Sequence, residues 1–81
     1  MEYIVSNHAR QMMIERELDP YWVAGTVANP DAVENQPDGN RHYFRAIPER
    51  AGRVLHVVMN EAGIPAILVT VYFDRNRRGK L

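Results

Sequence analysis

His8 is the residue whose type and position best suit acid–base chemistry. Ser6 is a good N-cap and is followed by apolar residues at helical spacing, so we expect His8 in the first turn of a helix. The positive end of a helix dipole favours the neutral form of an imidazole. A neutral imidazole there suits a general base, or an acid–base shuttle near neutral pH. The alternative is an exposed histidine without a catalytic task.

A second candidate site lies in the second half of the chain, on one face of a predicted sheet. Strand alternation gathers arginines, tyrosines and a threonine there: Tyr43, Arg45, Arg53, Thr70 and Tyr72. Arginine pairs with phosphate, hydroxyls donate hydrogen bonds, and tyrosines stack on bases. Arg75 belongs to the basic segment 74–81, which we expect to be a charged tail or to contact phosphate. The alternative is an ordinary solvated sheet face, which carries the same residue types.

No motif indicates a metal or a cofactor. His8, His42 and His56 are far apart, and none has a carboxylate at the spacing of a zinc peptidase. The glycines are isolated, so none forms a phosphate-binding loop, and the chain has no cysteine. We therefore expect neither a metal nor a cofactor. We expect His42 to pack within a strand and His56 to lie in the core.

The composition fits one small globular domain spanning residues 1–81. Apolar residues make up 46% of the chain and charged residues 25%, which excludes intrinsic disorder. Without cysteines or a recognisable signal peptide, the chain is expected to be cytoplasmic. Its longest apolar stretch, residues 64–73, is too short to span a membrane, so no membrane partner is expected.

The net charge is zero, but the two halves of the chain differ. Residues 1–40 hold two basic and seven acidic residues, whereas residues 41–81 hold eight basic and three acidic ones. The basic half is compatible with a surface for RNA or an acidic partner. The alternative is that the two halves neutralise each other in the fold.

The elements that position these residues are predicted to be two helices followed by a sheet, an α+β fold. Asp19-Pro20 restarts the chain in a second helix, which Asn29-Pro30 ends. Alternating and β-branched segments then indicate a three- to four-stranded antiparallel sheet. The expected ranges are a strand or hydrophobic staple at 3–5, helices at 7–17 and 20–28, and strands at 32–35, 41–47, 54–59 and 64–73.

A four-residue loop at Asn60–Gly63 would set the register of the last hairpin. Met59 then faces Ile64, Leu55 faces Leu68, and Arg53 faces Thr70. One face carries Arg53, Leu55, Val57, Thr70 and Tyr72, and the other carries Val54, His56, Val58, Ile67, Val69, Val71 and Phe73. We expect the second, more apolar face to be covered by the helices. A one-residue slip would exchange the two faces.

Several short motifs resemble domain-of-unknown-function family 4258. The opening has a histidine–alanine pair at His8-Ala9, then methionines at 12 and 13 and Arg16. Asn29-Pro30-Asp31 and the segment 69–72 also fit the family layout, so the resemblance covers roughly residues 6–75. The family is similar in architecture to toxins of the RelE and BrnT type, in which two helices precede an antiparallel sheet.

The resemblance implies metal-independent RNA cleavage in a toxin–antitoxin context. In that reaction the ribose 2′-hydroxyl attacks the adjacent phosphate and leaves a cyclic phosphate and a free 5′-hydroxyl. A base, an acid and a cation are needed. By motif, the resemblance assigns roles to His8, Arg16, Thr70 and Tyr72, whereas Arg45 and Arg53 are inferred from strand alternation. The expected catalytic set is His8, Arg45, Thr70 and Tyr72, and the expected RNA-binding set is Arg16, Tyr43, Arg53 and Arg75.

Two features favour a different function. Ribosome-dependent toxins of this type are usually strongly basic, and this chain is neutral. The aromatic pair Tyr21-Trp22 is a candidate for a protein interface, and a small domain gains stability by oligomerising. The alternative function is therefore a non-catalytic interaction module that forms a homodimer. The expected partners are RNA and a cognate antitoxin for the first function, and a second copy for the alternative.

Overall fold

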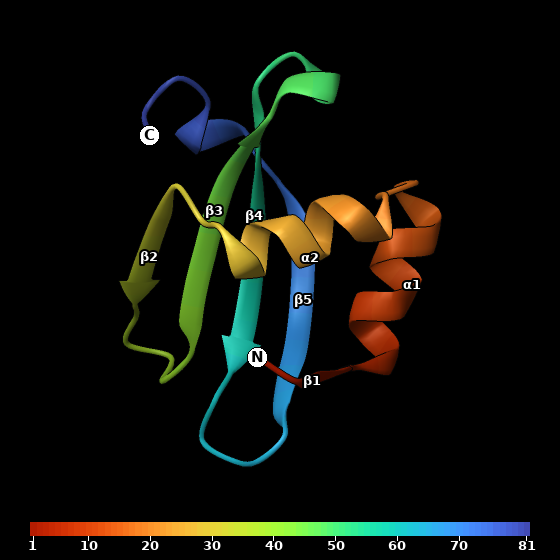
Figure 1. Cartoon of the computed structure of the whole chain (residues 1–81), viewed down its shortest axis with the longest axis vertical. Helices are drawn as coiled ribbons and strands as arrows, with labels where there is room; N and C mark the ends of the chain where they lie inside the picture. The colour runs from red at the N-terminus through yellow and green to blue at the C-terminus, as the bar shows by residue number, and fades with distance from the viewer.

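The computed structural model describes all 81 residues as an α+β fold (Figure 1). It consists of two helices and five strands, with one short 3₁₀ turn between the third and fourth strands and another after the fifth. In chain order they are β1 (Tyr3–Val5), α1 (Asn7–Glu15), α2 (Pro20–Ala28), β2 (Ala32–Asn35), β3 (Arg41–Ile47), η1 (Pro48–Arg50), β4 (Arg53–Asn60), β5 (Ala66–Asp74) and η2 (Arg75–Arg77). Neither helix is long and apolar enough to cross a membrane.

The sheet has five strands in the order β1-β5-β4-β3-β2. The strands from β2 through β5 pair antiparallel with their neighbours, as predicted. The first strand, β1, pairs parallel to β5, so the sheet is mixed. The prediction of a purely antiparallel sheet of three or four strands is therefore wrong. Three residues of β1 carry too little pattern to distinguish an edge strand from a hydrophobic staple.

Local signals place both helices correctly. Ser6 caps α1 by accepting a hydrogen bond from the Ala9 amide, and Asp19 caps α2 by accepting one from the Tyr21 amide. The first helix ends at Glu15 rather than at residue 17, because Glu17 adopts a left-handed backbone conformation with φ 51°.

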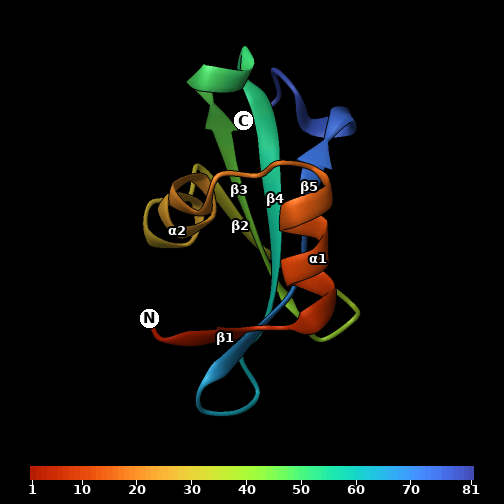
Figure 2. The ribbon, with the colours of Figure 1, turned by 90° about the vertical axis from the view of Figure 1, so that its right-hand side faces the viewer.

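The helices occupy different places on the sheet (Figure 2). The second helix crosses one face and packs on β3 and β4. The first lies along β5, beyond the short stretch that β1 pairs, so it covers the edge that β1 leaves open.

The register of the last hairpin differs from the prediction. The connecting loop extends from Glu61 to Pro65, and β5 begins only at Ala66. Met59 consequently lies opposite Leu68 rather than Ile64. A bulge in β5 at Val69 shifts the register by one more residue between the pairs Met59–Leu68 and Val58–Thr70, so Leu55 lies opposite Phe73 rather than Leu68. Neither the longer loop nor the bulge has a clear signal in the sequence.

The bulge exchanges the faces of β4, because it makes the total displacement of the register odd, whereas the displacement at the loop alone is even. Leu55, Val57 and Met59 lie in the core beneath the helices and are fully buried. The predicted core residues Val54, His56 and Val58 point to the opposite face of the sheet. They are buried as well, each at most 5% exposed, because the C-terminal segment packs against that face.

Arg77 fixes the C-terminal segment over the far face. Its guanidinium lies 4.2 Å from the centroid of the Phe44 ring and donates a 2.9 Å hydrogen bond to Glu34. That bond to Arg77 is the main reason why the pKa of Glu34 falls to about 2. The basic segment 74–81 is thus in part a cover for the sheet, not only a charged tail.

Candidate functional site

Two of the predicted catalytic residues meet at the edge of β5. The His8 Nε2 atom lies 3.1 Å from the Thr70 Oγ1 atom, although 62 residues separate them. Ser6 makes this contact possible because its amide donates to the Leu68 carbonyl and its hydroxyl donates to the Val69 carbonyl, at 3.1 and 3.0 Å. The start of α1 is therefore bonded to β5 at the bulge residue and at the residue before it.

Tyr72 lies on the same face of β5 as Thr70, two residues along the strand. Burial raises the pKa of its phenol, so the hydroxyl remains protonated and is available as a donor. We call His8, Thr70 and Tyr72 the edge site. His8 is exposed to solvent, and the other two side chains are half-buried.

Beside Tyr72, four side chains form a hydrogen-bonded row across the far face, here called the histidine relay. Asp38 Oδ2 lies 2.9 Å from His42 Nε2, His42 Nδ1 lies 2.7 Å from His56 Nε2, and His56 Nδ1 lies 3.1 Å from Asp74 Oδ2. Both imidazoles are about 5% exposed, whereas 45% of the Asp38 side chain is accessible. The His56 ring packs on Tyr72, with ring centroids 4.7 Å apart.

Burial lowers the pKa of His56, against the opposing effect of its hydrogen bond to Asp74. The His56 imidazole therefore resists protonation. Its two nitrogens lie beside His42 Nδ1 and Asp74 Oδ2, so the relay holds the ring in one orientation.

The sequence carries no signal that joins the residues of the relay. His42 is predicted to pack within a strand, and the predicted register places His56 in the core beneath the helices, which is wrong. In the correct register His56 pairs with Phe44, so it is diagonal to His42 on the adjacent strand. Alternation in residues 41–47 gave the side on which His42 points, but nothing local indicated its partner.

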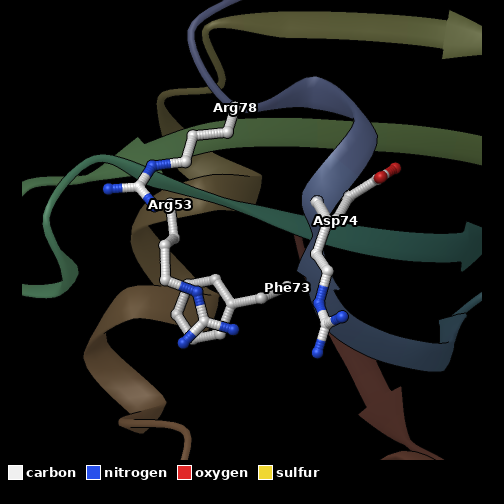
Figure 3. A pocket seen from close by; sticks show the side chains of 5 residues that line it. Arg53, Phe73, Asp74 and Arg78 are labelled. Carbon is white, nitrogen blue, oxygen red and sulfur yellow. The ribbon is translucent and has the colours of Figure 1, made fainter.

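A cluster of arginines surrounds a pocket of about 490 Å³ where β4 begins and β5 ends (Figure 3). We call it the arginine pocket. It is lined by Arg53, Phe73, Asp74, Arg75 and Arg78. The Arg53 guanidinium stacks 4.4 Å from the centroid of the Phe73 ring, and Arg78 donates a 3.0 Å hydrogen bond to the Ala51 carbonyl. None of the three arginines forms a salt bridge. The pocket includes Arg53 and Arg75, which were predicted to bind RNA, and adds Arg78.

The predicted sheet-face cluster is divided between the two faces. Tyr43, Arg45 and Arg53 share the helix-covered side, whereas Thr70 and Tyr72 share the opposite side. The prediction that all five side chains lie on one face is wrong, because it depended on the predicted register, in which Arg53 lies opposite Thr70.

Tyr43 and Arg45 have structural partners instead. Tyr43 is 4% exposed, and its hydroxyl donates to Glu61. Burial, followed by that hydrogen bond, raises its pKa to about 12. Arg45 donates a 2.6 Å hydrogen bond to the Asn29 carbonyl at the end of α2. Arg16 is exposed at the C-terminal end of α1.

No group of three or more His, Asp or Glu side chains converges in a geometry that could hold a metal ion. The relay contains four such side chains, but its row of hydrogen bonds uses all four imidazole nitrogens.

Comparison with protein families gives one match, over residues 5–73, to the model of a domain of unknown function, DUF4258. Comparison with curated proteins and with solved structures gives no match.

Proposed function

Because the chain belongs to the DUF4258 family, a domain of unknown function, we propose a function from its own residues: a toxin-like, metal-independent endoribonuclease. The observation that carries this proposal is the contact between His8 Nε2 and Thr70 Oγ1, with Tyr72 on the same face. It places an exposed imidazole against one hydroxyl group, and a second hydroxyl-bearing residue follows two positions along the same strand face. Such groups can exchange protons and orient a phosphate.

In the proposed reaction His8 acts first as a base. It removes the proton of a ribose 2′-hydroxyl, whose oxygen forms a bond to the adjacent phosphorus while the bond from phosphorus to the 5′ oxygen breaks. Protonated His8 then returns the proton to the leaving 5′ oxygen. Thr70 holds the imidazole by its hydrogen bond, and Tyr72 donates to a phosphate oxygen, where negative charge develops.

The arginine pocket supplies cationic charge for the RNA backbone. Asp74 is the fourth residue after Thr70 along β5, which corresponds to about 13 Å along a strand. Arg53 and Arg75 are therefore proposed to bind a neighbouring phosphate of an extended single strand rather than the phosphate being cleaved. Arg45, on the helix-covered side, has no role in this scheme.

Cleavage of a single-stranded RNA by purified chain tests the proposal. His8→Ala should reduce the rate about 100-fold or more, the usual scale for losing a general base. Asn7→Ala, in the same exposed turn, is the matched control and should retain activity. The products should carry a cyclic phosphate and a 5′-hydroxyl. Thr70→Ser should retain more activity than Thr70→Val, because only serine preserves the hydroxyl. Equal rates for the wild type and His8→Ala would eliminate the catalytic role of His8.

Toxicity is tested separately by inducing expression in growing cells. The wild type and Asn7→Ala should arrest growth, and His8→Ala should not. A cognate antitoxin is the partner expected to relieve the arrest. Healthy growth with all three chains would contradict the toxin assignment.

An alternative proposal is a non-catalytic homodimer, and the exposure of Tyr21 favours it. This side chain is 86% exposed on α2, whereas its neighbour Trp22 packs against Phe73, with ring centroids 6.3 Å apart. A large exposed aromatic is typical of an interface residue. Light scattering should then report a dimer that Tyr21→Ala dissociates, and the chain should not cleave RNA.

A further inference from the structure

We infer that the arginine pocket binds a single phosphate-class oxyanion, and that the histidine relay keeps this site open by holding the Asp74 carboxylate away from the arginines. His56 and His42 are thus positioning residues for an anion site. The choice of a phosphate-class ligand rests on the proposed function. The test is independent of that function, because it uses sulfate and no RNA.

The arginine pocket concentrates positive charge that no salt bridge compensates. Arg53, Arg75 and Arg78 have no carboxylate within salt-bridge distance, whereas Arg41 and Arg77 elsewhere do. Like charges gathered in this way repel one another, and an oxyanion relieves that repulsion. Arg50 adds a fourth cation nearby, 5.8 Å from the centroid of the same Phe73 ring that Arg53 covers.

Two of the three guanidinium groups of the pocket are already held in place. Arg53 lies over the Phe73 ring, which contacts its flat face and leaves its N–H edges free for a ligand. Arg78 is fixed by its hydrogen bond to the Ala51 carbonyl. An anion therefore meets a partly preorganised set of donors, which lowers the entropy lost on binding.

Asp74 is the one acidic residue that lines the pocket. Its carboxylate points away from Arg53 and Phe73 (Figure 3). Both oxygens are occupied, since Oδ1 accepts a 3.0 Å hydrogen bond from the Asn76 amide and Oδ2 contacts His56 Nδ1 at 3.1 Å. Only 14% of the side chain is accessible. Asp74 therefore does not neutralise the arginines beside it.

The rest of the relay secures that arrangement. His42 contacts His56 Nε2 at 2.7 Å and fixes the orientation of its ring, and Asp38 holds His42 from the other side. The other charged groups on this face, Glu34 and Arg77, bind each other. Loss of the His56 donor would leave Asp74 free to turn toward the arginines and compete with the anion.

Sulfate binding to the whole chain, followed by NMR chemical-shift titration at constant pH, tests the inference. Arg53→Gln or Arg75→Gln should weaken sulfate binding about tenfold, the scale of a lost charge-assisted hydrogen bond. Arg10→Gln, on the exposed side of α1, is the matched control and should bind as the wild type does. Asp74→Asn should bind sulfate about threefold more tightly, because it removes a negative charge beside the site.

The relay is tested by a rescue experiment. His56→Leu should bind sulfate about fivefold more weakly, because Asp74 then pairs with an arginine. His56→Leu/Asp74→Asn should recover the affinity of Asp74→Asn. His56→Gln retains an amide donor and should resemble the wild type. If the leucine variant does not fold by circular dichroism, Asp74→Asn and His56→Gln still carry the test.

The outcomes separate this inference from the proposed function. Unchanged sulfate binding in both arginine variants would overturn the anion site. Weaker binding by Asp74→Asn, or no recovery in the double variant, would overturn the role of the relay. If sulfate binding follows the expected pattern and RNA is not cleaved, the inference stands and the nuclease proposal fails.

Discussion

Replacing Ser6 by alanine should both destabilise the fold and disconnect the edge site. The serine hydroxyl accepts the Ala9 amide as the N-cap of α1 and donates to the Val69 carbonyl of β5. Loss of an N-cap costs about 1 kcal/mol. Loss of a hydrogen bond that leaves a half-buried carbonyl without a donor costs about another 1 kcal/mol. We therefore expect the free energy of unfolding to fall by about 2 kcal/mol.

The assay is urea denaturation of the wild type, Ser6→Ala and Ser6→Thr. Threonine retains the hydroxyl and is a good N-cap, so it should lose less than half of what alanine loses. For a domain of this size the alanine variant should also melt roughly 8 °C lower or more. RNA cleavage by folded Ser6→Ala should fall as well, because the first turn of α1 no longer holds His8 beside Thr70.

A loss below about 0.5 kcal/mol would refute this reasoning, since it is the range of an ordinary surface substitution. It would mean that the remaining backbone hydrogen bond, from the Ser6 amide to Leu68, suffices to join α1 to β5. Unchanged cleavage by a destabilised Ser6→Ala would separate the two effects and remove the positional role of the serine.

Three further predictions concern the stability of the fold. Leu55→Ala, at a fully buried core position, should lower the free energy of unfolding by about 2–5 kcal/mol, whereas the conservative Leu55→Met should cost less than about 1.5 kcal/mol in the same denaturation experiment. Burial lowers the pKa of His56, so below the unfolded value near 6.5 the unfolded chain binds a proton that the folded chain resists, and the free energy of unfolding should decrease as the pH decreases below about 6.5. A His56→Gln variant whose stability has the same slope between about pH 5 and 6.5 would contradict this. The pKa of Glu34 is lowered to about 2, so its contribution is present above pH 4.5 and is lost as the pH falls toward 2; a carbon NMR titration midpoint near 4.5 would contradict the bond to Arg77.

Much of the secondary structure could be predicted because its causes are local. The caps Ser6 and Asp19 start both helices where expected, and alternation in residues 41–47 gave the strand and the face of each side chain. The family assignment also followed from the sequence, through the motif at His8-Ala9 and its later companions.

The candidate site was predictable only in part. His8 and Thr70 were both proposed, and the fold brings them together. Arg45 and Tyr43 were proposed with them, but they lie on the other side of the sheet. The error came from one hairpin. A loop that ends at Pro65 rather than Gly63 moves the register along the strand, and the bulge at Val69 changes which face of β5 lies beside which face of β4.

By itself the sequence determined the order of the two helices and the four later strands, the helix caps and an unequal distribution of charge along the chain. Only the tertiary structure decided the parallel pairing of β1, the strand register, the histidine relay and the arginine pocket. The physical reason is sequence separation. A helix cap or an alternating strand depends on neighbours within a few residues, whereas the His42–His56 contact spans 14 residues and the His8–Thr70 contact spans 62. Such contacts depend on loop lengths and on a bulge, where a shift of one residue turns a side chain to the opposite face.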